Sequence, residues 1–183
     1  MVCELIHHCT SNLPEGEGFI GGAFTNTMKI NLIAVGNRMP AWVTTAYQEY
    51  AKRMPRECSL QLLEINPAHR GKSGNSEKIK QEECKRIQAA IPKGASVIAL
   101  DEHGMSWSTR KLSAQLAGWM QEGPDIALLV GGADGLSSEC LGRARLRWSL
   151  SPLTLPHPMV RVVVAEQLYR AWSLLHGHPY HRG

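Results

Sequence analysis

Glycines that follow an apolar run near the middle of the sequence form its first candidate ligand site. Gly131-Gly132-x-x-Gly135 comes directly after such a run, and glycines there let a ligand approach backbone N–H groups because no Cβ intervenes. The pattern lacks the G-x-G-x-x-G fingerprint and the Walker lysine, so a dinucleotide site or a P-loop is disfavoured. A tight turn between a strand and a helix explains the same glycines equally well.

An apolar segment rich in proline, residues 150–158, is the second candidate. It contains Pro152, Pro156 and Pro158, which forbid a regular strand or helix, although its composition is not that of a polar surface loop. We expect it to pack under other parts of the chain and to line a pocket, where Leu153 and Leu155 flank a flat ring such as adenine. A simple connector between elements is the alternative.

Titratable and aromatic side chains gather toward the C-terminus. Arginines and histidines are frequent after residue 143, whereas Glu166 is the only acid there. His157 titrates near neutral pH, so it is a candidate general base, and His181 is another. Arg182 or Arg161 is a candidate for stabilising an anion or gripping phosphate, and the tail from 177 to 182 could stack on a base. A solvated face and a frayed chain end are the alternatives.

The elements that must position these residues follow an alternating pattern. Apolar runs predict strands at 30–35, 60–65, 97–100, 126–130 and 147–150, and helical periodicity predicts helices at 40–54, 76–91, 108–121, 137–143 and 159–175. Trp42, Ala46, Tyr50 and Met54 define the apolar face of the first helix. This alternation predicts an α/β fold with a mostly parallel sheet that helices cover on both faces.

Parallel sheets bind ligands beyond the carboxyl ends of their strands. Leu100 ends the third predicted strand, Gly131 follows the fourth, and residues 150–157 follow the fifth. We therefore expect these three loops, which are far apart in sequence, to form one ligand site.

Composition is that of a globular chain. Of the 183 residues 43% are hydrophobic and 20% are charged, and the formal net charge of +4 permits an acidic partner such as RNA without requiring one. The longest apolar runs are too short for a membrane span. The five cysteines are scattered, so the spacing predicts neither a disulfide framework nor a zinc ribbon and favours a reducing cytosol.

Residues 1–27 differ in character from the rest. They are rich in turn-forming residues and show no sustained period, which predicts a disordered extension or an upstream start ahead of the true one at Met28. Metal binding is disfavoured because the candidate ligands do not match an established zinc spacing; they are Cys3, His7, His8 and Cys9. Residues 28–183 are expected to form a single domain.

Several motifs together resemble the RlmH family of SPOUT-class methyltransferases, over the range from Met28 to the C-terminus. The motifs are Met28-Lys29-Ile30-x-Leu32-x-Ala34-Val35-Gly36, Leu129-Val130-Gly131-Gly132-Ala133-Asp134-Gly135-Leu136, Trp148-Ser149-Leu150-Ser151, Leu153-Thr154-Leu155-Pro156-His157-Pro158, Val160-Arg161-Val162, Glu166-Gln167-Leu168-Tyr169-Arg170-Ala171 and His178-Pro179-Tyr180-His181-Arg182.

The resemblance implies a deep trefoil knot in the C-terminal half, a homodimer in the cytoplasm, and transfer of a methyl group from S-adenosylmethionine to N3 of a pseudouridine. The RNA substrate is large-subunit (23S) ribosomal RNA, expected within the assembled ribosome, and no metal or membrane is implied. The cofactor contacts carried over by motif are Leu100, Gly131, Leu150, Ser151, Pro152, Leu153, Thr154 and Leu155. A non-catalytic RNA-binding module and a nucleotide-binding protein of Rossmann type are the alternatives.

Overall fold

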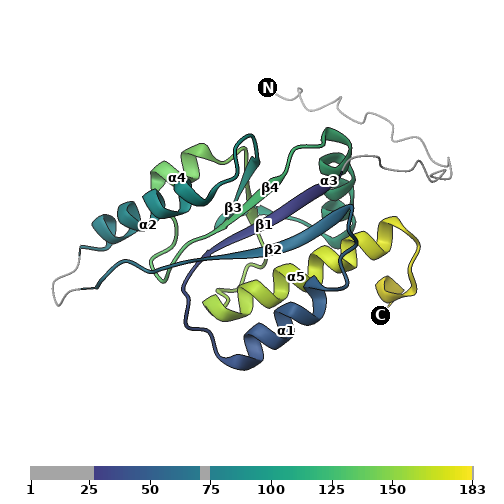
Figure 1. Ribbon diagram of the computed structural model, residues 1–183, viewed down its shortest axis with the longest axis horizontal. Helices are drawn as coiled ribbons and strands as arrows, with labels where there is room; N and C mark the ends of the chain where they lie inside the picture. Colours follow the sequence, from purple (N-terminus) through teal and green to yellow (C-terminus); the bar gives the residue numbers. More distant parts are fainter. Residues whose placement is uncertain (1–26, 71–74, 183) are drawn as a thin grey trace, which may run out of the picture.

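Five parallel strands form the centre of the described chain, in the order β2-β1-β4-β3-β5. Figure 1 labels β1 to β4, which lie side by side. The computed structural model describes residues 27–70 and 75–182, and for residues 181 and 182 it describes the backbone alone. The strands are Met28–Val35 (β1), Cys58–Ile65 (β2), Ser96–Ser106 (β3), Ile126–Val130 (β4) and Leu146–Ser149 (β5). The parallel α/β sheet that the sequence predicts is confirmed.

Helices cover both faces of this sheet, as predicted (Figure 1). Helices α1 (Ala41–Ala51), α3 (Thr109–Glu122) and α5 (His157–Leu175) pack on one face. Helices α2 (Ser76–Ala90) and α4 (Ser138–Arg143) pack on the other. A short 3-10 helix, η1 (Pro179–Arg182), packs back against α5.

Burial and capping explain why these segments form these elements. Strand β4 is buried along its whole length, and Lys29 is the only exposed residue of β1, because helices cover both sides of the central strands. Helices α2, α3 and α4 each follow a polar residue, Asn75, Ser108 and Ser137, whose side chain accepts a hydrogen bond from a backbone N–H of the first turn.

Strand β3 extends further than predicted. It continues to Ser106 instead of ending at Leu100, and its pairing with β5 shifts register between Leu100 and Met105. Its second part approaches β5 closely, since a Cβ on Gly104 would lie 2.7 Å from the carbonyl carbon of Arg147. Asp101 and Gly104 are residues typical of strand ends, which explains why the pattern predicted a boundary there.

Two details of the helices also differ from the prediction. Trp42, predicted on the apolar face of α1, is 53% exposed, and the buried residues are Val43 and Tyr47, which share the same spacing of four. Helix α5 begins at His157 rather than Met159. Pro158 is tolerated there because the N–H groups of the first turn have no partner within the helix.

The chain crosses the sheet between β5 and α5. Strand β5 lies at one edge, whereas His157 at the start of α5 contacts Val35 at the end of β1, beyond β3 and β4. Residues 150–156 therefore run across the carboxyl ends of β3 and β4. This path is consistent with the C-terminal trefoil knot implied by the resemblance, and the knot itself stays a prediction.

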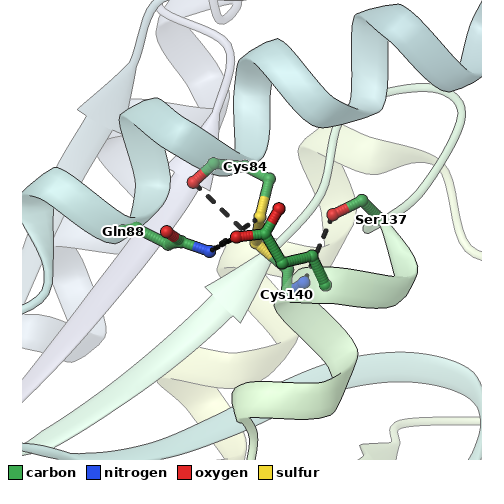
Figure 2. Close-up of a disulfide and its surroundings, with 5 residues drawn as sticks. Cys84, Gln88, Ser137 and Cys140 are labelled. Atoms are coloured by element: carbon green, nitrogen blue, oxygen red, sulfur yellow. Dashed lines mark hydrogen bonds between the residues drawn. A yellow bond between two sulfur atoms is a disulfide. The ribbon is translucent and has the colours of Figure 1, made fainter.

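A disulfide joins Cys84 in α2 to Cys140 in α4, with their Cα atoms 5.8 Å apart (Figure 2). Next to it, the side chain of Gln88 donates a hydrogen bond to the carboxylate of Glu139 at 2.9 Å. The cysteine spacing predicted no disulfide framework and gave no sign of this single pair. The two residues are 56 positions apart and meet only because α2 and α4 pack on the same face of the sheet.

We expect reduction of this disulfide to lower the free energy of unfolding by about 4 kcal/mol, because the bond closes a loop of 56 residues in the unfolded chain. Urea unfolding with and without a phosphine reductant measures the difference. Cys140→Ser, which cannot form the bond, should show the lower stability under both conditions. Equal stability of the oxidised and reduced native sequence would contradict this expectation.

Within residues 27–70 and 75–182, no helix is long and apolar enough to cross a membrane. The same part of the chain contains no group of three or more His, Cys, Asp or Glu side chains placed to hold a metal ion. The predicted N-terminal extension and its four candidate metal ligands lie outside the described residues, apart from Thr27.

Candidate active site

Strand pairing brings the three predicted loops together at the carboxyl edge of the sheet, where the parallel strands end. Ala99 of β3 pairs with Leu129 of β4. The next residue of each strand, Leu100 and Val130, therefore lie beside each other, and Val130 directly precedes Gly131. On its other side, Leu100 pairs with Trp148, two residues before Leu150. The loops at Leu100, Gly131 and Leu150 therefore lie side by side, as predicted.

The turn after β4 is closed so tightly that it requires glycine. The N–H of Gly135 donates to the carbonyl of Gly132 at 3.0 Å, and Gly135 adopts φ +80°, in the left-handed region. A Cβ on Gly131 would overlap the carbonyl carbon of Gly135. In the same turn, Asp134 pairs with Arg70 at 2.6 Å, which links the loop after β2 to the turn.

The proline-rich loop is more exposed than predicted. Pro152, Leu153 and Thr154 are exposed, Leu153 to 75%, whereas Leu150 and Leu155 are half-buried. The backbone is ordered locally: the hydroxyl of Ser151 accepts the N–H of Leu153 at 2.9 Å. This local hydrogen bond satisfies the N–H of Leu153, so that this backbone group needs no partner from another part of the chain. The prediction of a covered loop is therefore wrong within one chain, and Leu153 offers an apolar side chain to a ligand or a second molecule.

His157 is held at the end of β1 by its ring. Its Nε2 lies 2.5 Å from the carbonyl oxygen of Val35, and because a carbonyl only accepts, Nε2 carries the proton. Burial lowers the pKa of His157 below the ordinary 6.5; the Val35 hydrogen bond opposes this and the charge of Arg161 adds to it. At neutral pH the ring is therefore uncharged, and its lone pair is on Nδ1.

Arg161 is an interior residue and not a surface cation. Its side chain is 1% exposed, and its guanidinium donates to Glu64 at 2.5 Å and to the carbonyl of Gly36 at 2.6 Å. These contacts join α5 to the carboxyl ends of β1 and β2. The suggestion that Arg161 grips phosphate is wrong, because its charged end is enclosed and occupied by protein groups.

The C-terminal tail does not meet His157 within one chain. Tyr180 in η1 donates a hydrogen bond to Glu166 at 3.1 Å. Glu166 is nine residues along α5 from His157, which is about 14 Å at the rise of an α-helix. His181 and Arg182, which follow Tyr180, are thus anchored away from His157, and their side chains lie outside the described residues.

Glu83 in α2 is a feature of this edge that the sequence reasoning missed. It is 3% exposed, and one carboxylate oxygen accepts the N–H of Ala68 at 3.1 Å. The available signal was its position: Glu83 lies midway between the buried residues Ile79 and Ile87, on the apolar face of an otherwise charged helix.

A cavity of about 450 Å³ opens at the ends of β1 and β2. Asn37, Arg38 and Asn66 give it a polar wall, with Gly36, Met39 and Pro67 completing the lining. Gly36 connects the cavity to the site, since a Cβ built on it would lie 3.5 Å from Nε2 of His157. The sequence reasoning selected none of these residues as a site residue, although Gly36 ends the first motif of the resemblance.

The fold and this edge define an α/β protein of the class in which small ligands bind beyond the carboxyl ends of parallel strands. The sequence model of the family described as predicted SPOUT methyltransferase matches residues 28–181. The chain belongs to this family.

Individual relatives agree with this assignment. The chain is 61% identical over 155 residues to ribosomal RNA large subunit methyltransferase H of Thioalkalivibrio sulfidiphilus, covering 85% of this chain and 99% of that protein. The protein of the same name from Nitrosococcus oceani is 57% identical over 155 residues, with the same coverage. Among solved structures, a methylase family protein of Haemophilus influenzae has a TM-score of 0.52 at 14% identity, covering 84% of this chain and 69% of that one, which shows the fold alone.

Proposed function

We propose that this protein transfers the methyl group of S-adenosylmethionine to N3 of a pseudouridine in large-subunit ribosomal RNA. The observation that carries the proposal is the meeting of three loops at the carboxyl edge of the sheet, in a chain that belongs to a methyltransferase family. The names of the relatives support ribosomal RNA as the substrate.

The residues present fit the cofactor. The contacts would come from Leu100, Gly131 and the loop from Leu150 through Ser151, Pro152, Leu153 and Thr154 to Leu155. Exposed and half-buried leucines suit an adenine ring, and the tight glycine turn brings backbone groups close to a ligand because no side chain intervenes. When bound there, S-adenosylmethionine supplies an electrophilic methyl group on a sulfonium.

His157 is the residue of this edge best suited to accept the proton of N3. An imide nitrogen must lose its proton to become a good nucleophile, and a neutral imidazole accepts a proton at its free nitrogen. Because Nε2 is committed to Val35, the accepting atom is Nδ1. The adjacent cavity with Arg38 suits the phosphate and base of the target nucleotide.

A homodimer would complete the site. Within one chain the tail lies away from His157, so His181 and Arg182 would reach the site of a second copy. There Arg182 would pair with phosphate or with the developing imide anion, and His181 is a second candidate base. We propose that the enzyme works in the cytoplasm on the assembled ribosome.

Methyl transfer from labelled S-adenosylmethionine to ribosomes, followed by mass spectrometry of the rRNA nucleosides, tests the proposal. We expect one methylated pseudouridine, and none with rRNA that lacks pseudouridine. Saturable rRNA binding without any cofactor binding in calorimetry would favour a non-catalytic RNA-binding module instead.

Substitution of His157 by alanine should lower kcat about 10²- to 10⁴-fold while leaving the affinity for ribosomes unchanged. In the native enzyme the rate should be constant near pH 7 and fall as the pH drops through the lowered pKa of His157, below 6.5, because protonation removes the accepting lone pair. His181→Ala is measured in parallel, with exposed His176→Ala as the control. Near-normal turnover in both the His157 and His181 variants would exclude a histidine base.

A further inference from the structure

The second carboxylate oxygen of Glu83, Oε2, is buried and has no hydrogen-bond partner in the described part of the chain. The first oxygen is satisfied by the N–H of Ala68. A buried carboxylate oxygen without a partner is costly, because it loses its hydration and gains nothing in return. The position is therefore informative about what else binds there.

This free oxygen faces the glycine turn. A Cβ built on Gly132 would lie 2.6 Å from Oε2, closer than any other atom. Because Gly132 has no side chain, the carboxylate lies directly against the turn that forms one wall of the proposed cofactor pocket. The charge of Glu83 also raises the pKa of His157, so the two side chains interact electrostatically.

Among the described residues, no ion pair includes Glu83. Arg70 pairs with Asp134 of the turn, Arg86 on the same helix pairs with Glu82, and Arg161 pairs with Glu64. A cationic hydrogen-bond donor from a ligand would satisfy it best, since charge-assisted hydrogen bonds are the strong ones.

We propose that Oε2 of Glu83 accepts a hydrogen bond from the α-ammonium group of bound S-adenosylmethionine. The inference rests on the proposed function. A carboxylate can only accept, and the ammonium is the one charged donor of this cofactor, whereas its sulfonium carries no N–H or O–H. The adenine end would lie across the edge at Leu153 and Leu155, which leaves the amino-acid end for the turn after β4.

Calorimetric titration of the full-length protein with three probes tests this assignment. S-adenosylmethionine and S-adenosylhomocysteine carry the ammonium, and 5′-methylthioadenosine keeps the adenosine but lacks it. Glu83→Gln should weaken the first two about ten- to hundredfold, as expected for a hydrogen bond between charged groups, and leave the third within about twofold. Glu82→Gln is the matched control, because it removes a neighbouring exposed carboxylate and should change none of the three affinities.

An equal loss for all three probes would show that Glu83 only shapes the turn or contacts the ribose, and unchanged affinities would show that it makes no contact; either result overturns the assignment. Glu83→Asp keeps the charge but withdraws the carboxylate, so it should give the same selective loss if the glutamine variant folds poorly. Failure of the native protein to bind any probe would instead refute the proposed function, together with the inference that rests on it.

Discussion

Replacement of Gly131 by alanine is expected to weaken cofactor binding at least a hundredfold and to lower methyl transfer with it. The new Cβ would overlap the carbonyl carbon of Gly135 and lie 2.6 Å from its oxygen and 2.7 Å from the nitrogen of Leu136. These are backbone atoms, so the turn must open to make room. Displacement of a binding wall by about 1 Å costs on the order of a hundredfold, and we expect at least that loss of affinity for S-adenosylmethionine in calorimetry.

Gly142→Ala is the control for this experiment. Gly142 lies in α4, shortly after the turn, and a Cβ there would have no atom within 4 Å. Alanine favours a helix over glycine by about 1 kcal/mol, so this variant should be slightly more stable and bind the cofactor normally. Full affinity in a folded Gly131→Ala variant would mean that the cofactor binds elsewhere.

Substitution of Arg161 by methionine should lower the free energy of unfolding by about 3 kcal/mol, the lower end of the range for a broken buried ion pair, because Glu64 is 40% exposed and can recover some hydration. Methionine keeps much of the volume but leaves the carbonyl of Gly36 without its donor. Lysine should not restore stability, since one ammonium cannot bond to Glu64 and to the carbonyl groups in the planar geometry of a guanidinium. Urea unfolding measures each variant.

Arg145→Met separates the effect of burial from the loss of an arginine. Arg145 pairs with Glu122 at 2.7 Å, but both side chains are largely exposed. Its removal should leave the midpoint of urea unfolding almost unchanged, because water screens surface ion pairs. Equal losses at positions 145 and 161 would contradict the assignment of Arg161 as the interior link between α5 and the ends of β1 and β2.

The parts of the fold that the sequence predicted correctly depend on local chemistry. Helical periodicity predicted a helix at 108–121, and the apolar residues Leu112, Leu116 and Trp119 on one face of α3 are buried. Apolar runs predicted the strands, because central strands of a covered sheet must be apolar on both sides. The boundary at Leu100 was wrong because register and bulges depend on the neighbouring strand.

Candidate site residues were predictable only where a motif marks them. Gly131 and His157 stand in motifs that the resemblance identifies, and their placement at one edge follows from the parallel sheet. Glu83 and Arg161 belong to the same edge, yet their roles depend on which groups surround them. In the sequence, a charged residue that is buried looks the same as a charged residue on the surface of a helix. Only its position on the apolar face distinguishes it.

The sequence by itself therefore determined the class of fold, the order of its elements and the three loops that end beside one another, since these follow from periodicity, turn chemistry and the geometry of parallel sheets. Tertiary structure alone decided the pairing of Cys84 with Cys140, the commitment of His157 Nε2 to Val35 and the free oxygen of Glu83. These contacts join residues 49 to 122 positions apart and depend on packing at the level of single atoms, which no local pattern encodes.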